Sequence, residues 1–169
     1  MIRGILIDIL IAILLILLQA VVCNHICVFD IATPFVFIFI LLQLPLSLSI
    51  NWVMTIAFFV GLSVDIFSDT QGMNALACLI LAVARHPIFS MYVLRDDKFE
   101  DIVPSFATVG VPTYFKYTLT ASALYCILIC AIQDFSFAEM PLLAMRIVGC
   151  TLLTTVTVVA IDLLLNSHK

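Results

Sequence analysis

The feature that most constrains this chain is a series of long apolar runs with very few charged residues inside them. The first, from about Ile5 to Val22, contains one charged side chain, Asp8. A helix needs about 20 apolar residues to cross a bilayer, and local thinning accommodates shorter runs. Only 11% of the residues are charged and 64% are hydrophobic, whereas soluble globular chains average about 25% and about 45–50%. The sequence therefore predicts an integral membrane protein.

We expect a single all-α domain, a bundle of six transmembrane helices over residues 1–169. The expected spans are about 5–22, 34–46, 52–67, 73–86, 114–132 and 141–165. The second is unusually short; it begins near Pro34, which suits a helix start. Residues 88–94 could extend the fourth span through a kink at Pro87. We favour instead a short helix on the membrane surface, because Arg85 would otherwise lie in mid-membrane.

The distribution of charge between the loops predicts the orientation. Lys and Arg in short loops concentrate on the cytoplasmic side of a membrane. With the N-terminus inside, that side receives Arg3, Arg85, Arg95, Lys98 and Lys169. The opposite side then receives Asp30, Asp65, Asp69, Asp134 and Glu139. Both termini are therefore expected to be cytoplasmic. The net charge of −4 and the lack of a basic stripe argue against nucleic acid as a partner.

A carboxylate interrupts the third apolar run, within the segment GLSVDIFSDTQGMNA at residues 61–75. An ionisable side chain at the centre of a membrane helix costs about 2.5–3.5 kcal/mol on insertion scales, so Asp65 is a functional-site hypothesis by default. Its partner could be Arg146, the start of the fourth helix near Asn74, or water at the outer surface. Gly61, four residues earlier, would allow another backbone to approach closely.

The second carboxylate of this segment has a simpler interpretation. Asp69 is expected to be a helix N-cap, since Ser, Asp and Thr favour that position. Ser68 and Gln71 have the spacing of a capping box, and Gly72 suits a tight turn.

Other polar residues recur at helical spacing inside the apolar runs. At 100° per residue, positions eleven apart return to nearly one face of a helix. Asp8 and Gln19 therefore share a face in the first helix, and Thr151, Thr155 and Asp162 share one in the last, with Thr154 on its flank. Such stripes face protein or water rather than lipid. Two alternatives stay open: the Asp side chains reach cytoplasmic water, or the Thr hydroxyls bond to their own helix.

No residue pattern indicates a cofactor, a metal or catalysis. Cys78, Cys126, Cys130 and Cys150 fall in expected spans, where Cys behaves as a small hydrophobe. Cys23, His25 and Cys27 cluster in the first outer loop, but a structural zinc site needs four ligands. A local disulfide there is a second alternative. Aspartyl proteases hold two carboxylates from separate segments together, whereas Asp65 and Asp69 follow one another in a single segment.

The chain as a whole resembles the bacterial rod shape-determining protein MreD family. That family has about this length, six spans, and a short second helix ending in Leu-Pro, here Leu44-Pro45. Its most recognisable segment is Gly-x-x-x-Asp-Leu-Phe-Ser-Asp, followed by a turn into a Gly-x-x-Ala helix. The matching residues here are Gly61, Asp65, Ile66, Phe67, Ser68, Asp69, Gly72 and Ala75. This chain departs from the family at His86, inserted before Pro87, and has Cys126 and Cys130 where one branch carries paired histidines.

The resemblance implies a non-enzymatic subunit of the cell-elongation machinery in the bacterial inner membrane. Its expected partners are an MreC-like single-span protein and, through it, MreB filaments and the RodA–PBP2 synthase. Members of the family are also thought to share the fold of the substrate-binding S components of ECF vitamin transporters. That relation supplies a second functional hypothesis, although the short acidic outer loops offer few groups to a vitamin.

Overall fold

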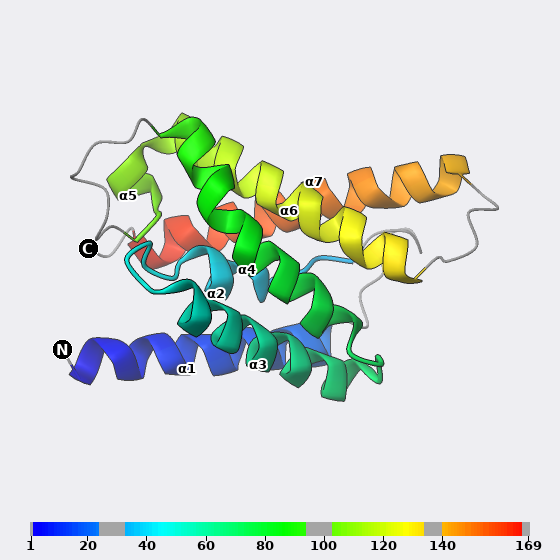
Figure 1. The fold of residues 1–169 in the computed structure, drawn as a ribbon, viewed down its shortest axis with the longest axis horizontal. Helices are drawn as coiled ribbons and strands as arrows, with labels where there is room; N and C mark the ends of the chain where they lie inside the picture. Colours follow the sequence, from blue (N-terminus) through cyan, green and yellow to red (C-terminus); the bar gives the residue numbers. More distant parts are fainter. Residues whose placement is uncertain (1, 24–32, 94–102, 134–139, 167–169) are drawn as a thin grey trace.

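The computed structural model describes residues 2–23, 33–93, 103–133 and 140–166, and within these ranges it contains helices and no strand. Figure 1 shows the helices packed as one bundle. They are α1 (Ile2–Leu18), the π-helical turn η1 that continues it (Gln19–Cys23), α2 (Ile38–Leu42), α3 (Ile50–Ser68), α4 (Met73–Tyr92), α5 (Phe106–Val109), α6 (Val111–Gln133) and α7 (Met140–Asn166).

Four of these helices, α3, α4, α6 and α7, are long and apolar enough to cross a membrane. A shorter apolar helix covers Ile9–Val21. The described chain is helical, as predicted, and the lengths of these four helices are those of a multi-pass membrane protein. Three of the expected spans, 52–67, 114–132 and 141–165, agree with α3, α6 and α7 to within three residues at each end.

The expectation of a helix over residues 34–46 is wrong. Only Ile38–Leu42 is helical, and five residues rise about 7.5 Å against a hydrocarbon core of about 30 Å. Pro34 lies in non-helical chain four residues before the helix starts. At the other end, Pro45 disfavours helical geometry in the residue before it, so the helix ends early. We call residues 33–49 the central segment; Figure 1 shows its helix, α2, surrounded by the longer helices.

The prediction of a separate surface helix over residues 88–94 is also wrong. α4 continues through Pro87 to Tyr92, so the fourth helix has 20 residues. Pro87 removes one N–H from the helical ladder, yet the helix does not end there. Arg85, whose charge argued for a break, is 3% exposed inside the bundle and has hydrogen-bond partners there.

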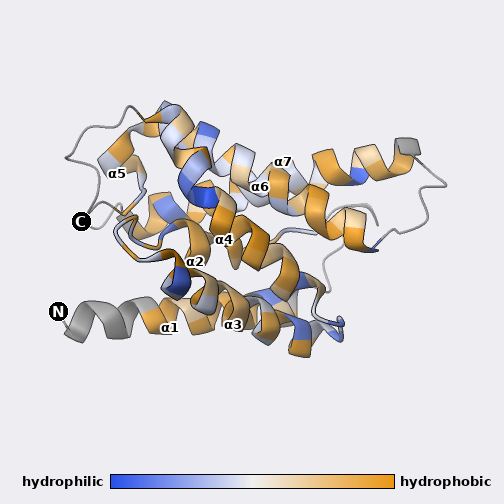
Figure 2. Cartoon of the chain, in the orientation of Figure 1, coloured by the Kyte–Doolittle hydropathy of each residue, from blue (hydrophilic) through white to orange (hydrophobic). Residues whose placement is uncertain are grey.

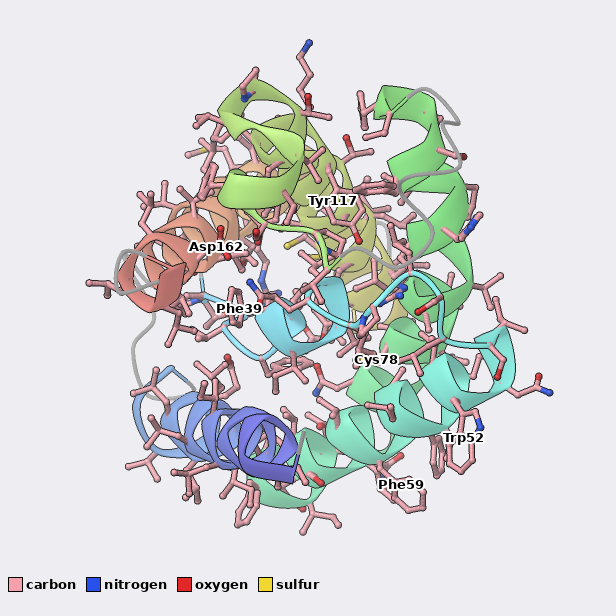
Figure 3. All side chains as sticks on the ribbon, turned by 90° about the vertical axis from the view of Figure 1, so that its left-hand side faces the viewer. Phe39, Trp52, Phe59, Cys78, Tyr117 and Asp162 are labelled. Atoms are coloured by element: carbon pink, nitrogen blue, oxygen red, sulfur yellow. The ribbon has the colours of Figure 1, made fainter. Side chains whose placement is uncertain are left out.

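The side chains divide the bundle into an apolar outside and a mixed interior. Trp52 and Phe59 project outward from α3, at 65% and 61% exposure (Figure 3). Apolar side chains of α2, such as Ile38 and Leu42, are fully buried. Figure 2 shows polar residues concentrated at the turn between α3 and α4 and in the second half of α4. Since lipid solvates apolar side chains, an apolar exterior of this kind is typical of membrane proteins.

The two ends of the described chain lie at the same end of the bundle. α1 begins there and α7 ends there, together with the end of α4 and with α5 (Figure 1). This arrangement is compatible with the prediction that both termini are cytoplasmic, and the orientation itself stays a prediction.

Candidate functional site

The Asp65 carboxylate, near the end of α3, caps the start of α4. Its Oδ1 accepts hydrogen bonds from the Asn74 backbone N–H (3.0 Å), the Asn74 side-chain amide (3.0 Å) and the Thr70 hydroxyl (2.5 Å). Its Oδ2 accepts the Ala75 backbone N–H at 2.8 Å. The first amides of a helix have no partner within that helix, and a negative charge there also complements the helix dipole. Of the three partners expected for Asp65, the structure therefore provides the start of the fourth helix.

Gly61 brings the two helices into backbone contact at the same place. A Cβ added to Gly61 would lie 2.6 Å from the Ala75 Cα and 2.8 Å from the Asn74 carbonyl oxygen. Real Cβ atoms do not approach so closely, so only glycine allows this crossing. The expected close approach is confirmed, and it explains why Asp65, one turn later, reaches the α4 amides.

The expectation that Asp69 is an N-cap is wrong. Asp69 is the C-cap residue of α3, in the left-handed conformation (φ 53°, ψ 38°), and its N–H donates to the Asp65 carbonyl. α4 starts four residues later, after Gly72, which is also left-handed at φ 78°. Gly72 thus occupies the tight turn that was expected, while the capping carboxylate comes from the preceding helix. Asp and Asn tolerate the left-handed region better than most residues, so the motif position still suits Asp69.

A hydrogen bond between Tyr125 and Asn74 connects the hydrogen bonds around Asp65 to α6. The Tyr125 hydroxyl donates to the Asn74 side-chain oxygen at 2.5 Å, and Tyr125 is fully buried. Its ring packs edge-on against Phe37 of the central segment, with centroids 5.7 Å apart. The α3–α4 turn is therefore connected through Asn74 and Tyr125 to the interior of the bundle.

Two side chains hold the beginning of the central segment. The Gln19 Oε1, in η1, accepts the Val36 backbone N–H at 2.8 Å, and the Thr154 hydroxyl, in α7, accepts the Phe35 N–H at 3.1 Å. Non-helical backbone at membrane depth is tolerated only where protein or trapped water satisfies its polar groups. Gln19 and Thr154 are 1% and 0% exposed, so they serve this purpose inside the protein.

Arg85 holds the other end of the central segment. Its Nη1 donates to the Leu41 carbonyl at 2.8 Å and its Nη2 to the Pro45 carbonyl at 2.7 Å. The last carbonyls of a helix lack partners within that helix, and Pro45 prevents its continuation. A cation at this end also has the favourable sign for the helix dipole.

Asp162, in α7, joins the central segment to α5. Its Oδ1 accepts the Gln43 side-chain amide at 2.5 Å, and its Oδ2 accepts the Phe106 N–H, the first amide of α5, at 3.1 Å. Asp162 is fully buried, so the prediction of a seam facing protein is confirmed and the alternative that it reaches cytoplasmic water is not.

The remaining residues of the predicted polar stripes have mixed outcomes. Thr151 and Thr155 are buried, as expected, and the Thr155 hydroxyl bonds to the Thr151 carbonyl of its own helix at 2.7 Å. Arg146 is half-buried in α7 and takes part in an interaction. The Asp8 side chain lies outside the described part of the chain, so its pairing with Gln19 on one face stays a prediction.

The cysteines of the spans behave as small apolar residues. Cys78, Cys126, Cys130 and Cys150 are free thiols and buried. The cluster of Cys23, His25 and Cys27 lies outside the described side chains. Among the side chains that are described, no group of three or more His, Cys, Asp or Glu could hold a metal ion.

The sequence did not predict the hydrogen bonds of Gln43 and Tyr125, and it placed Arg85 at a membrane edge and not inside the bundle. Gln43 had a usable signal, since it is the one amide in the apolar run from Phe35 to Leu46. A lone amide in such a run needs a partner, which points to the protein interior rather than to lipid. Arg85 had the same signal, but its position beside Pro87 favoured a membrane edge.

The hydrogen bond between Gln43 and Asp162 can be tested by a double-mutant cycle. We expect Asp162→Ala and Gln43→Ala to destabilise the purified protein non-additively, with a coupling energy of about 1–2 kcal/mol, because each removes the same partly buried hydrogen bond. Reversible unfolding in detergent would measure it. As a matched control, Gln43→Ala combined with Thr70→Ala, which shares no partner with it, should be additive. Additivity of the first pair would contradict a stabilising hydrogen bond between Gln43 and Asp162.

This chain matches no protein-family model, no curated protein and no solved structure.

Proposed function

We propose that this protein is a non-catalytic scaffold subunit of the bacterial cell-elongation machinery, of the MreD type, in the cytoplasmic membrane. The observation that carries the proposal is the joint role of the motif residues on which the resemblance rests. Gly61, Asp65, Gly72 and Ala75 form a single unit in which one helix crosses and caps the next. A motif that fixes a helix crossing suits a protein that works by presenting rigid helices to partners.

The buried polar groups also support a structural role. Asp65, Asp162 and Arg85 each bind backbone amides or carbonyls of another segment. Such bonds fix the positions of helices relative to one another. The proposed partner is a single-span MreC-like protein that packs against the apolar exterior in the bilayer and connects the bundle to MreB and the RodA–PBP2 synthase.

The experiment is capture of the partner from native membranes. We expect the tagged protein to copurify with an MreC-like single-span protein, and depletion of the protein to produce round cells that still synthesise envelope. Recovery of the protein without any elongation component, together with normal rod shape after depletion, would contradict the proposal.

One observation favours a second function, that of a substrate-binding S component of an ECF-type vitamin transporter. The central segment is a short helix flanked by non-helical chain, and side chains of other helices bind its backbone groups inside the bundle. Transporters use interrupted helices of this kind at their binding sites. Saturable binding of a vitamin, with copurification of an energising ATPase pair, would favour this function over the scaffold.

A further inference from the structure

Arg85 is a buried cation near the middle of a membrane-spanning helix. Twelve residues of α4 precede it and seven follow it, and its side chain is 3% exposed. A guanidinium has five N–H donors, is always charged, and is costly to place in apolar surroundings without a partner. The two partners of this guanidinium are carbonyl oxygens, which are neutral. Two of the five N–H groups therefore have acceptors, but neither acceptor carries a negative charge to balance the guanidinium.

The acidic side chains that the structure describes are used elsewhere. Asp65 binds the start of α4, and Asp162 binds Gln43 and the start of α5. Asp69 is exposed at the end of α3. Within residues 33–93, 103–133 and 140–166, no carboxylate forms an ion pair with Arg85. Buried charges in proteins are normally paired, so this arrangement calls for an anion that the described chain does not provide.

Unpartnered hydroxyl groups lie on the helix that faces this part of α4. The Tyr117 ring packs edge-on against Phe89, one turn after Arg85, with centroids 5.3 Å apart. Its hydroxyl is buried and has no hydrogen-bond partner in the structure, and the same is true of Ser122. Tyr114 and Thr118 lie close enough to interact with each other. The spacing of these four residues places them on one face of α6. Figure 3 shows Tyr117 inside the bundle.

We propose that Arg85 and Tyr117, which lie close enough to interact electrostatically, form a binding site for an oxyanion, a carboxylate or a phosphate, in the interior between α4 and α6. An oxyanion accepts several hydrogen bonds at once, so it would engage the spare N–H groups of the guanidinium and the Tyr117 hydroxyl together. Water would satisfy the hydroxyl equally well but would leave the charge of Arg85 unbalanced. This site is independent of the scaffold function and does not require it.

The test is a thermal unfolding assay of the purified protein at constant ionic strength, with chloride as the reference salt. The soluble probes are inorganic phosphate and acetate, in nanodiscs of phosphatidylcholine. The lipid probe is phosphatidylglycerol, which replaces part of the phosphatidylcholine. We expect at least one of these probes to raise the melting temperature of the natural protein. A response to the soluble anions assigns a free ligand, whereas a response to phosphatidylglycerol alone assigns a lipid headgroup.

The variants separate binding from folding. Tyr117→Phe removes one unpartnered hydroxyl, so we expect an unchanged melting temperature without probe and an apparent affinity about tenfold weaker, as for loss of one hydrogen bond to a charged group. Tyr92→Phe is the matched control, because its hydroxyl is exposed and bonded to Thr120 between the same two helices. Arg85→Lys keeps the charge and should retain part of the response. Absence of any response in the natural protein, or equal responses of Tyr117→Phe and the natural protein, would overturn the proposal.

Discussion

Replacing Asp65 by Leu should be among the most damaging single changes in this protein. The substitution leaves the backbone N–H groups of Asn74 and Ala75 and the Thr70 hydroxyl without their acceptor. Each unsatisfied buried donor costs about 1–3 kcal/mol, so we expect a loss of about 3–5 kcal/mol of stability. The measurement is the amount of variant in the membrane, together with its unfolding in detergent.

Asp65→Asn is the informative comparison. An amide retains one oxygen, which can still accept from Asn74 and Thr70, but it presents a donor to the Ala75 N–H. We therefore expect an intermediate loss of about 1–2 kcal/mol, since one hydrogen bond and the charge are lost. If Asp65→Leu accumulated normally yet failed to restore cell shape, Asp65 would serve a partner rather than the fold. Normal abundance with normal shape would mean that the cap is dispensable.

Replacing Gly61 by Ala should separate α3 from α4. The new methyl group would lie 2.6 Å from the Ala75 Cα and 2.8 Å from its nitrogen, and backbone atoms of a helix cannot move aside individually. Overpacking a tight contact costs about 1–3 kcal/mol, and we expect the upper end of that range because the shift also lengthens the bonds from Asp65 to α4. Loss of melting temperature in detergent would measure it.

A second variant distinguishes a clash with backbone atoms from a clash with a side chain. Adding Ala75→Gly to Gly61→Ala should not restore stability, because the close atoms belong to the backbone of residues 74 and 75. Ser63→Ala, two residues along α3 and bonded only to its own helix, should change stability little. Rescue by Ala75→Gly would show that the two helices are held apart by side chains and not in backbone contact.

The substitutions at Asp65 and Gly61 bear on the proposed function as well as on the fold. If the protein is a scaffold, its partners depend on the relative placement of α3 and α4. Mild destabilisation at Gly61 or Asp65 should then weaken capture of the MreC-like partner in parallel with stability. A small-molecule activity, in contrast, would respond to changes in the interior, at Arg85 and Tyr117, independently of the crossing.

Much of the helical framework was predictable from local pattern. The long apolar runs predicted α3, α6 and α7, because a helix that crosses lipid must satisfy its own backbone and carry apolar side chains along its whole length. Gly61 and Asp65 were identified for the same reason: a missing side chain and a lone carboxylate are conspicuous in such a run. The periodicity of α7 also indicated that Asp162 faces protein or water rather than lipid, and it is buried in protein.

The tertiary structure decided where the polar groups find their partners. The non-helical backbone on either side of α2 is tolerated because Gln19, Thr154 and Arg85 bind the central segment, and these contacts join residues 17 to 119 positions apart. Asp69 ends a helix instead of starting one because Asp65, from the previous turn, already caps α4. Local pattern shows only neighbours three or four residues away, so it can indicate that a buried charge needs a partner. Which segment supplies that partner depends on how the helices cross, and that is set by the packing of the whole bundle.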